Sequence, residues 1–195
     1  MYIQYVLSIC IFALFIAAIF IRAAYLQIHG IRVMVLGQTD KRDFLLAPLI
    51  LAIAYAALAK TFRLPIPGVL ISPFWAGAFS GFVGWVGLFL CAASLVALIL
   101  VFFSFGDSFR VGIDEDKPDR LITTGMFAHS RNPIYVCFLS FFCGLFLVHR
   151  SIAITVTAVI FALVIHRQIL REERFLETHY GDEYRAYRQK VRRYL

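Results

Sequence analysis

The chain has 195 residues, of which 61% are hydrophobic, and a formal net charge of +7. Because a soluble globular domain is nearer to half apolar, this composition excludes an ordinary soluble fold and predicts an all-α, polytopic membrane protein. The basic residues lie between and after the apolar segments rather than on a separate soluble module. This distribution excludes nucleic acid as the partner and leaves the lipid bilayer.

Metal and disulfide chemistry find no support in the sequence. The four cysteines form no C-x-x-C pair, and the five histidines lack the spacing of a metal-binding helix. We therefore expect neither a disulfide framework nor a metal site.

Three uncharged segments in the first half of the chain predict membrane-spanning helices. Residues 2–21 are long enough for one helical crossing of a hydrocarbon core about 30 Å thick. Residues 44–59 form the second segment, with Pro48 in its first turn, where a missing N–H does least harm. The third helix begins near Phe74, after three prolines, and runs to Gly106. It carries a predicted small-residue stripe for close helix contact, made of Gly77, Gly81 and Gly84.

Two further apolar segments predict a tight helical hairpin. Residues 134–148 and 151–165 have fifteen residues each, and only His149 and Arg150 separate them. Since neither is long enough to cross alone, we expect both helices to extend into their polar flanks. The complete expectation is five transmembrane helices in a single membrane domain over residues 1–195, with three helices within 1–105 and the remaining elements within 106–195.

The distribution of basic residues predicts the orientation. Of the nineteen Lys and Arg residues, only Lys60, Arg63 and Arg150 fall on one side of the five predicted spans. By the positive-inside rule, the loop before residue 134 and the C-terminal segment face the cytoplasm, and the N-terminus lies outside.

The C-terminal segment shows helical spacing of apolar and aromatic residues, interrupted at Gly181. It is interpreted either as an amphipathic helix anchored on headgroups by basic residues that include Arg193, or as a lid over a site. The two readings are compatible. The spaced residues are Leu176, Tyr180, Tyr184, Tyr187, Val191 and Tyr194.

Polar residues gather where the hairpin meets the predicted cytoplasmic face. The loop LITTGMFAHSRNP, residues 121–133, contains Gly125, which permits close backbone approach, and ends with Pro133 as the first residue of a helix. Arg131 and Asn132 directly precede that helix, whose exposed N–H groups favour an anionic ligand group. Glu172 and Glu173 follow the second helix of the hairpin, so the two regions must be neighbours. Together they suit a ligand that carries both charges, such as an amino acid headgroup.

These residues also carry a resemblance to a known family. The series LITTGMFAHSRNPIY, followed by EERFLETHYGDEYRAY, resembles the isoprenylcysteine carboxyl methyltransferase and phospholipid methyltransferase group of integral membrane enzymes, over roughly residues 106–195. The resemblance implies a five-helix methyltransferase that uses S-adenosylmethionine, yields S-adenosylhomocysteine and admits a lipophilic acceptor from the bilayer.

Carried over by position, the resemblance implies catalytic roles for Tyr135, Arg167 and Glu173. Asn132 stands where the isoprenylcysteine enzymes have His, and Gln168 stands where they have an arginine important for activity, next to Arg167. The implied cofactor-binding residues are Leu121, Gly125, His129, Arg131, Asn132, Pro133, Glu172 and Glu173.

The implied roles divide the site into two parts. We expect Arg131 and the loop backbone to hold the cofactor's polar end, and Glu172 or Glu173 to hold its amino or ribose groups. Tyr135 and Arg167 would face the acceptor, which could be a prenylcysteine-like carboxylate, a lipid amine or a small apolar molecule. Two alternatives stay open: an NADPH-dependent membrane reductase of the steroid or sterol type, with a similar Arg-x-Pro-x-Tyr layout, and a non-enzymatic scaffold or transporter.

Overall fold

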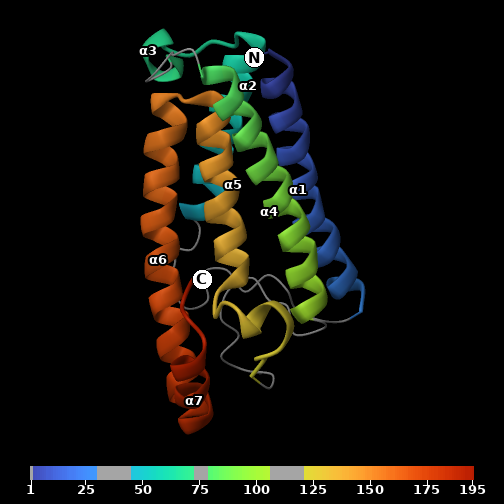
Figure 1. Ribbon diagram of the computed structural model, residues 1–195, viewed down its shortest axis with the longest axis vertical. Helices are drawn as coiled ribbons and strands as arrows, with labels where there is room; N and C mark the ends of the chain where they lie inside the picture. The colour runs from blue at the N-terminus through green and yellow to red at the C-terminus, as the bar shows by residue number, and fades with distance from the viewer. Residues whose placement is uncertain (1, 30–44, 73–78, 106–120) are drawn as a thin grey trace.

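A computed structural model describes residues 2–29, 45–72, 79–105 and 121–195 (Figure 1). All regular elements in these ranges are helical, which confirms the all-α prediction for this part of the chain. The helices are α1 (Tyr2–Ile28), α2 (Leu46–Phe62), α3 (Gly68–Ile71), α4 (Ser80–Phe105), the 3-10 turn η3 (Gly125–Ala128), α5 (Pro133–His149), α6 (Ile152–Tyr180) and α7 (Asp182–Lys190).

Three of these helices are long and apolar enough to cross a membrane, namely α1, α4 and α6. The apolar helices α2 and α5 have 17 residues each. At 1.5 Å per residue each is about 26 Å long, slightly shorter than a typical hydrocarbon core. The structure therefore confirms a helical membrane protein with three long candidate spans, and the full count of five crossings stays a prediction.

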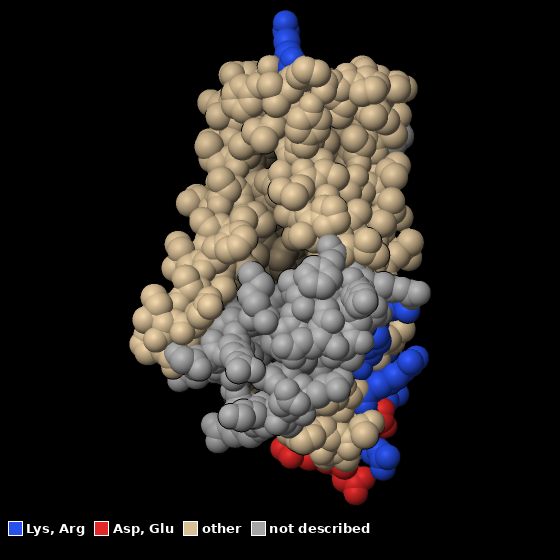
Figure 2. Space-filling view, turned by 180° about the vertical axis from the view of Figure 1, so that it is seen from behind, with Lys and Arg blue, Asp and Glu red and all other residues tan. Residues whose placement is uncertain are grey.

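The surface of the bundle agrees with this assignment. Figure 2 shows a long face without charged residues, one basic side chain at its upper tip, and the other visible Lys, Arg, Asp and Glu side chains gathered toward the lower end. The chain's C-terminal elements, the lower part of α6 with α7, lie at this end (Figure 1). Lipid contact and polar chemistry are thus separated along the long axis of the molecule.

Helix α1 departs from the sequence prediction by extension, because it continues past residue 21 to Ile28. Helix α6 continues fifteen residues past Ile165, in line with the expected extension into its polar flank. Gly181, with a φ of 52°, ends α6 and confirms the predicted interruption. The predicted start of the third span near Phe74 lies outside the described residues. The single turn α3 was not expected, because Pro65 and Pro67 directly precede it.

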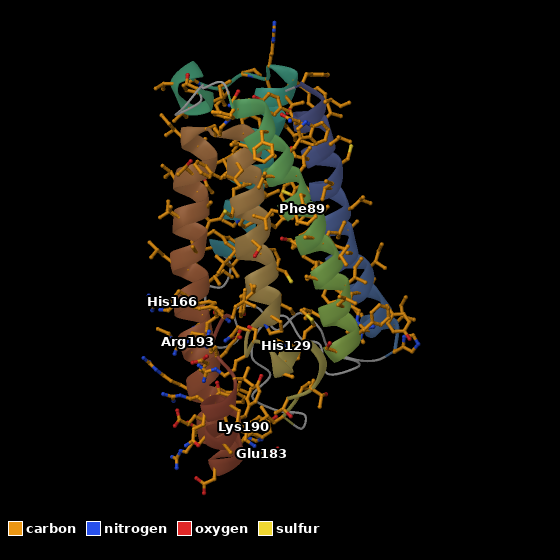
Figure 3. The ribbon with its side chains drawn as sticks, viewed as in Figure 1. Phe89, His129, His166, Glu183, Lys190 and Arg193 are labelled. Atoms are coloured by element: carbon orange, nitrogen blue, oxygen red, sulfur yellow. The ribbon has the colours of Figure 1, made fainter. Side chains whose placement is uncertain are left out.

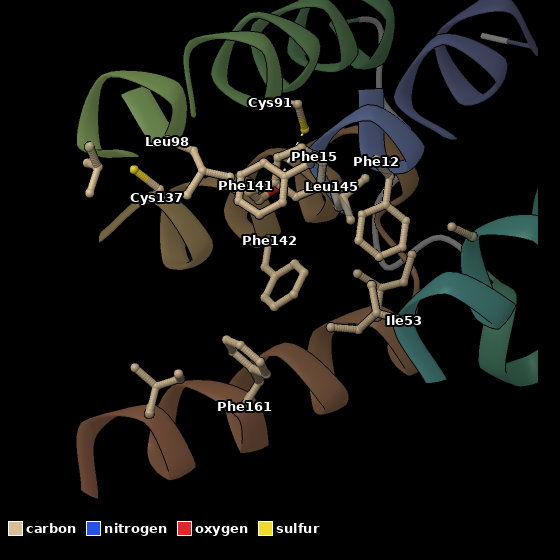
Figure 4. Packing of buried hydrophobic residues seen from close by; sticks show 14 of the residues in the cluster. Phe12, Phe15, Ile53, Cys91, Leu98, Cys137, Phe141, Phe142, Leu145 and Phe161 are labelled. Atoms are coloured by element: carbon tan, nitrogen blue, oxygen red, sulfur yellow. Dashed lines mark hydrogen bonds between the residues drawn. The ribbon is translucent and has the colours of Figure 1, made fainter. Parts of the chain in front are cut away.

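Aromatic rings in tilted and edge contacts connect α1, α5 and α6 inside the bundle (Figure 4). Phe141 lies 4.4 Å from Phe15, and Phe142 makes an edge contact with Phe161 at 4.6 Å, both measured between ring centroids. All four rings are buried. Because lipid tails are as apolar as these side chains, van der Waals packing rather than hydrophobic transfer holds such helices together.

The glycines that allow close helix contact are only in part the ones predicted. A Cβ atom built on Gly144 of α5 would lie 2.7 Å from the Gly87 carbonyl oxygen and 2.6 Å from the Cys91 sulfur, so α4 and α5 touch backbone to backbone here. A Cβ on Gly81 would meet nothing within 4 Å, and one on Gly84 would meet the Gln4 side chain. The predicted stripe was therefore wrong at Gly81, which lies in the first turn of α4, and its third member, Gly77, lies outside the described residues.

The predicted hairpin between α5 and α6 is confirmed. Arg150, with a φ of 50°, reverses the chain, and the Ser151 hydroxyl accepts a hydrogen bond from the Ile154 N–H at 3.3 Å. Arg150 Nη1 also donates to the Ser80 carbonyl oxygen at 2.8 Å, and Lys60 Nζ donates to the His149 carbonyl oxygen. These cations satisfy backbone carbonyls at the end of the bundle opposite α7 and tie α2, α4 and α5 together.

We predict that Gly144→Val lowers the free energy of unfolding by about 2 kcal/mol, because the new side chain forces α4 and α5 apart. The matched control is Gly81→Val, which adds the same side chain to open space and should change stability by less than about 0.5 kcal/mol. Thermal unfolding of both variants in the same detergent measures the difference. Equal midpoints for the two variants would contradict the contact.

Candidate active site

The two polar regions singled out in the sequence meet at one end of the bundle. Asn132, the residue before α5, donates from its side-chain amide to Glu173 Oε1 of α6 at 3.2 Å. Pro133 is the first residue of α5, as predicted. Because the side chain of Asn132 reaches across to α6, it does not cap its own helix. The hairpin therefore brings residues 41 positions apart into hydrogen-bonding contact.

Glu173 lies between two guanidinium groups. Arg131 Nη2 is 3.2 Å from Glu173 Oε1, and Arg193 approaches the second oxygen through Nε at 3.1 Å and Nη2 at 2.9 Å. The Glu173 and Arg131 side chains are only 8% and 7% exposed, and that of Arg193 is 32% exposed. The hydrogen bonds to Glu173 raise the pKa of Arg193, which stays protonated. The three groups together carry a surplus of one positive charge.

Arg131 has hydrogen-bonding capacity that the chain does not use. Its Nε and Nη1 atoms are buried and have no hydrogen-bond partner. Leaving a buried donor unsatisfied costs about 1–3 kcal/mol, and more for a charged group. Nε and Nη1 lie on different edges of the guanidinium, so each would take an acceptor of its own, and a carboxylate oxygen would form a charge-assisted hydrogen bond with either of them.

Glu172 faces α5 through a separate set of contacts. Its Oε1 atom accepts from the Tyr135 hydroxyl at 2.5 Å and from Gln168 Nε2 at 2.9 Å. Gln168 is buried and accepts in turn from Arg171, whereas Arg167 is exposed on α6. The structure thus joins Tyr135 to the glutamate pair through Glu172, and it places Gln168 rather than Arg167 beside that pair.

The segment after α7 lies over the start of α5. The carbonyl oxygen of Arg192 accepts from the Arg131 N–H at 3.0 Å, and that of Arg193 accepts from the Asn132 side chain at 3.2 Å. The Asn132 N–H donates to the Ser130 hydroxyl at 3.1 Å. These two backbone N–H groups are therefore bonded within the chain, whereas the Arg131 side chain keeps buried donors for an anionic group.

Comparison with known proteins shows the family of the chain. Residues 78–183, more than half of the chain, match the phospholipid methyltransferase family. The chain belongs to this family. It is also 63% identical over 38 residues to an uncharacterized protein of Haemophilus influenzae, a match that covers 19% of this chain and 60% of that protein. The chain thus spans less than two thirds of that relative's length, and no solved structure matches it.

The matched range includes the loop in which the methyltransferase resemblance predicted cofactor contacts. Gly125, with a φ of 61°, brings the loop against α4, where a Cβ would lie 2.5 Å from the Ser104 hydroxyl oxygen. Gly125 thus makes a close backbone approach to a helix of the same chain, and its contact with the cofactor stays a prediction. Leu121 is half-buried, and His129 is exposed on the turn before α5 (Figure 3). None of the contacts found among the described residues joins these three loop residues to Glu172 or Glu173.

The sequence analysis did not predict that Arg193 belongs to the candidate site. It was interpreted as a surface anchor because it lies in a basic run, yet it binds Glu173 next to α6 (Figure 3). The signal that could have found it is the tyrosine spacing in α7. Tyr184 and Tyr187 are buried, and the Tyr187 hydroxyl donates to the Phe127 carbonyl oxygen at 2.7 Å, so this segment packs onto the protein as a lid would.

The residues that the structure describes contain no group of three His, Cys, Asp or Glu able to hold a metal ion. The charged groups of the site are thus the two glutamates and the arginines around them.

We predict that Glu173→Gln lowers the free energy of unfolding by about 3 kcal/mol, because Arg131 then stays buried beside a neutral amide. Glu177→Gln is the matched control. Glu177 lies one turn further along α6 and also bridges two arginines, Arg185 and Arg188, but on the exposed surface. Glu177→Gln should lower the free energy of unfolding by at most about 1 kcal/mol. Thermal unfolding that shifts equally in both variants would refute the buried pairing.

Proposed function

We propose that this protein is an S-adenosylmethionine-dependent methyltransferase that acts on a lipophilic acceptor at the cytoplasmic face of the membrane. The observation that carries the proposal is the buried Arg131 side chain, held by Glu173 yet with two donor atoms unsatisfied, in a member of a methyltransferase family. The site lies at the charged end of an apolar bundle, where a water-soluble cofactor and a bilayer-dissolved acceptor can meet.

The residues fit the polar arm of the cofactor. Arg131 would bind its carboxylate through Nε or Nη1, and Glu172 or Glu173 would accept from its amino or ribose groups. The remaining cofactor contacts implied by the resemblance would come from Leu121, Gly125, His129, Asn132 and Pro133. When bound, the cofactor supplies an electrophilic methyl group on a sulfonium.

The contribution of the protein to the reaction is then mainly positioning and exclusion of water. Methyl transfer needs the acceptor in line with the bond that breaks, and the rigid packing of α5 on α6 would hold both reactants in that geometry. A carboxylate acceptor, with an ordinary pKa near 4, is already ionised and needs only a cation such as Arg167 to orient it. An amine or thiol acceptor must lose a proton, and a glutamate of the pair would take it while Tyr135 faces the acceptor.

The proposed orientation follows from charge. The positive-inside rule assigns the end of the bundle that holds the glutamate pair and most basic residues to the cytoplasm, with the N-terminus outside. Cytosolic cofactors would then have direct access to the site. The reductase alternative gains no support from the comparisons, because the matched family is one of methyltransferases.

We predict that the detergent-purified protein binds S-adenosylhomocysteine and does not bind NADPH in calorimetric titrations. Arg131→Gln should weaken S-adenosylhomocysteine binding by about 10- to 100-fold, because a charged hydrogen-bonding partner is worth about 1.5–3 kcal/mol. Arg185→Gln, which removes an exposed arginine of α7, should leave the affinity unchanged. Binding of NADPH alone would favour the reductase, and binding of neither would favour the scaffold or transporter.

We predict that membranes containing the protein transfer label from methyl-labelled S-adenosylmethionine to an acceptor extractable into organic solvent. Arg167→Gln should lower the rate of labelling at least several-fold and leave S-adenosylhomocysteine affinity unchanged, because Arg167 is proposed to face the acceptor. Arg131→Gln should lower both quantities. If Arg167→Gln instead weakens S-adenosylhomocysteine binding, its proposed place on the acceptor side is wrong.

A further inference from the structure

Tyr184 of α7 is fully buried, at 0% exposure, and its hydroxyl has no hydrogen-bond partner. Its neighbour Tyr187 offers a direct comparison, because the two rings pack edge to face at 6.1 Å and the Tyr187 hydroxyl donates to the Phe127 carbonyl oxygen. Buried tyrosine hydroxyls are usually hydrogen-bonded. An unsatisfied one therefore points to a partner from outside the chain.

The charges that act on the Tyr184 hydroxyl are mainly those of the candidate active site. Burial, followed by the charge of Glu173, raises the pKa of Tyr184 to about 12, whereas Arg131, Arg188 and Arg193 act in the opposite direction. The phenol is therefore protonated at neutral pH and can donate a hydrogen bond. Gly181 turns the chain between α6 and α7, so that the helix that carries Tyr184 packs against the helix that carries Glu173.

The buried, unsatisfied polar atoms of Arg131 and Tyr184 have one property in common. Arg131 Nε and Nη1 are donors, and the protonated Tyr184 hydroxyl is a donor as well. Glu173 already accepts from Asn132, Arg131 and Arg193. The missing partner of these atoms is therefore an acceptor, and next to a surplus positive charge the favoured acceptor is an anion.

We propose that the Tyr184 hydroxyl is a ligand-binding group, which donates to the same anionic group that Arg131 binds. The inference rests on the proposed function, in which that anionic group is the carboxylate of the cofactor's amino acid arm. Tyr184 and Arg131 then bind it from two elements, α7 and the turn before α5. Helix α7 is in this way part of the binding site as well as a cover for it.

The test is Tyr184→Phe, titrated with S-adenosylhomocysteine. Loss of one hydrogen bond to a charged ligand group should weaken the affinity about 10- to 100-fold. The thermal midpoint of the ligand-free protein should stay the same or rise, because the removed hydroxyl has no partner there. The matched control is Tyr187→Phe, which should lower the ligand-free midpoint through loss of the bond to Phe127 and leave the affinity within about 2-fold.

Two outcomes would overturn the inference alone: wild-type affinity in Tyr184→Phe, or a fall in its ligand-free midpoint as large as that of Tyr187→Phe. The second outcome would show that the hydroxyl stabilises the fold itself. Failure of the wild-type protein to bind S-adenosylhomocysteine would instead overturn the proposed function and the inference with it. The ligand-free and liganded measurements therefore separate the two failures.

Discussion

The Glu173 carboxylate, held between Arg131 and Arg193 at the end of an apolar helix bundle, is the contact on which the rest of the site depends. Removing these charges from water is costly, and the cost is offset only when all three groups meet with good geometry. They belong to the turn before α5, to α6 and to the segment after α7. A single ionic cluster therefore requires the hairpin, the length of α6 and the reversal at Gly181 to be correct at the same time.

Helix packing far from Glu173 and its two arginines holds these three residues in position. The aromatic contacts of Phe141 and Phe142 and the backbone contact at Gly144 hold α5 against α1, α4 and α6. At the opposite end, Lys60 and Arg150 bind backbone carbonyls and close the hairpin. Between these ends α1, α4 and α5 are apolar, so the bundle can sit in lipid while its polar chemistry is concentrated at one end.

The electrostatic character of the cluster indicates what it binds. Two arginines against one carboxylate leave a surplus positive charge, and the unsatisfied atoms of Arg131 and Tyr184 are donors. A cluster built only for stability would satisfy its donors internally, as Tyr187 does with Phe127. The arrangement is therefore that of a binding site for an anionic group, and the glutamate pair adds acceptors for a ligand that also carries donors.

The sequence by itself determined the helical class, the hairpin, the start of α5 at Pro133, the break at Gly181 and the pairing of the Asn132 region with the glutamates. These follow from local chemistry: uncharged length, prolines and glycines, and the short link at Arg150. It could not determine that Gly144 rather than Gly81 makes the close helix contact, that Gln168 rather than Arg167 faces Glu172, or that Arg193 binds Glu173. Helical spacing tells which residues share a face, but only the rotation of each helix against its neighbours decides where that face points. A run of basic residues has the same sequence pattern whether its arginines contact lipid headgroups or bind a buried carboxylate. Only the tertiary structure distinguishes these two roles.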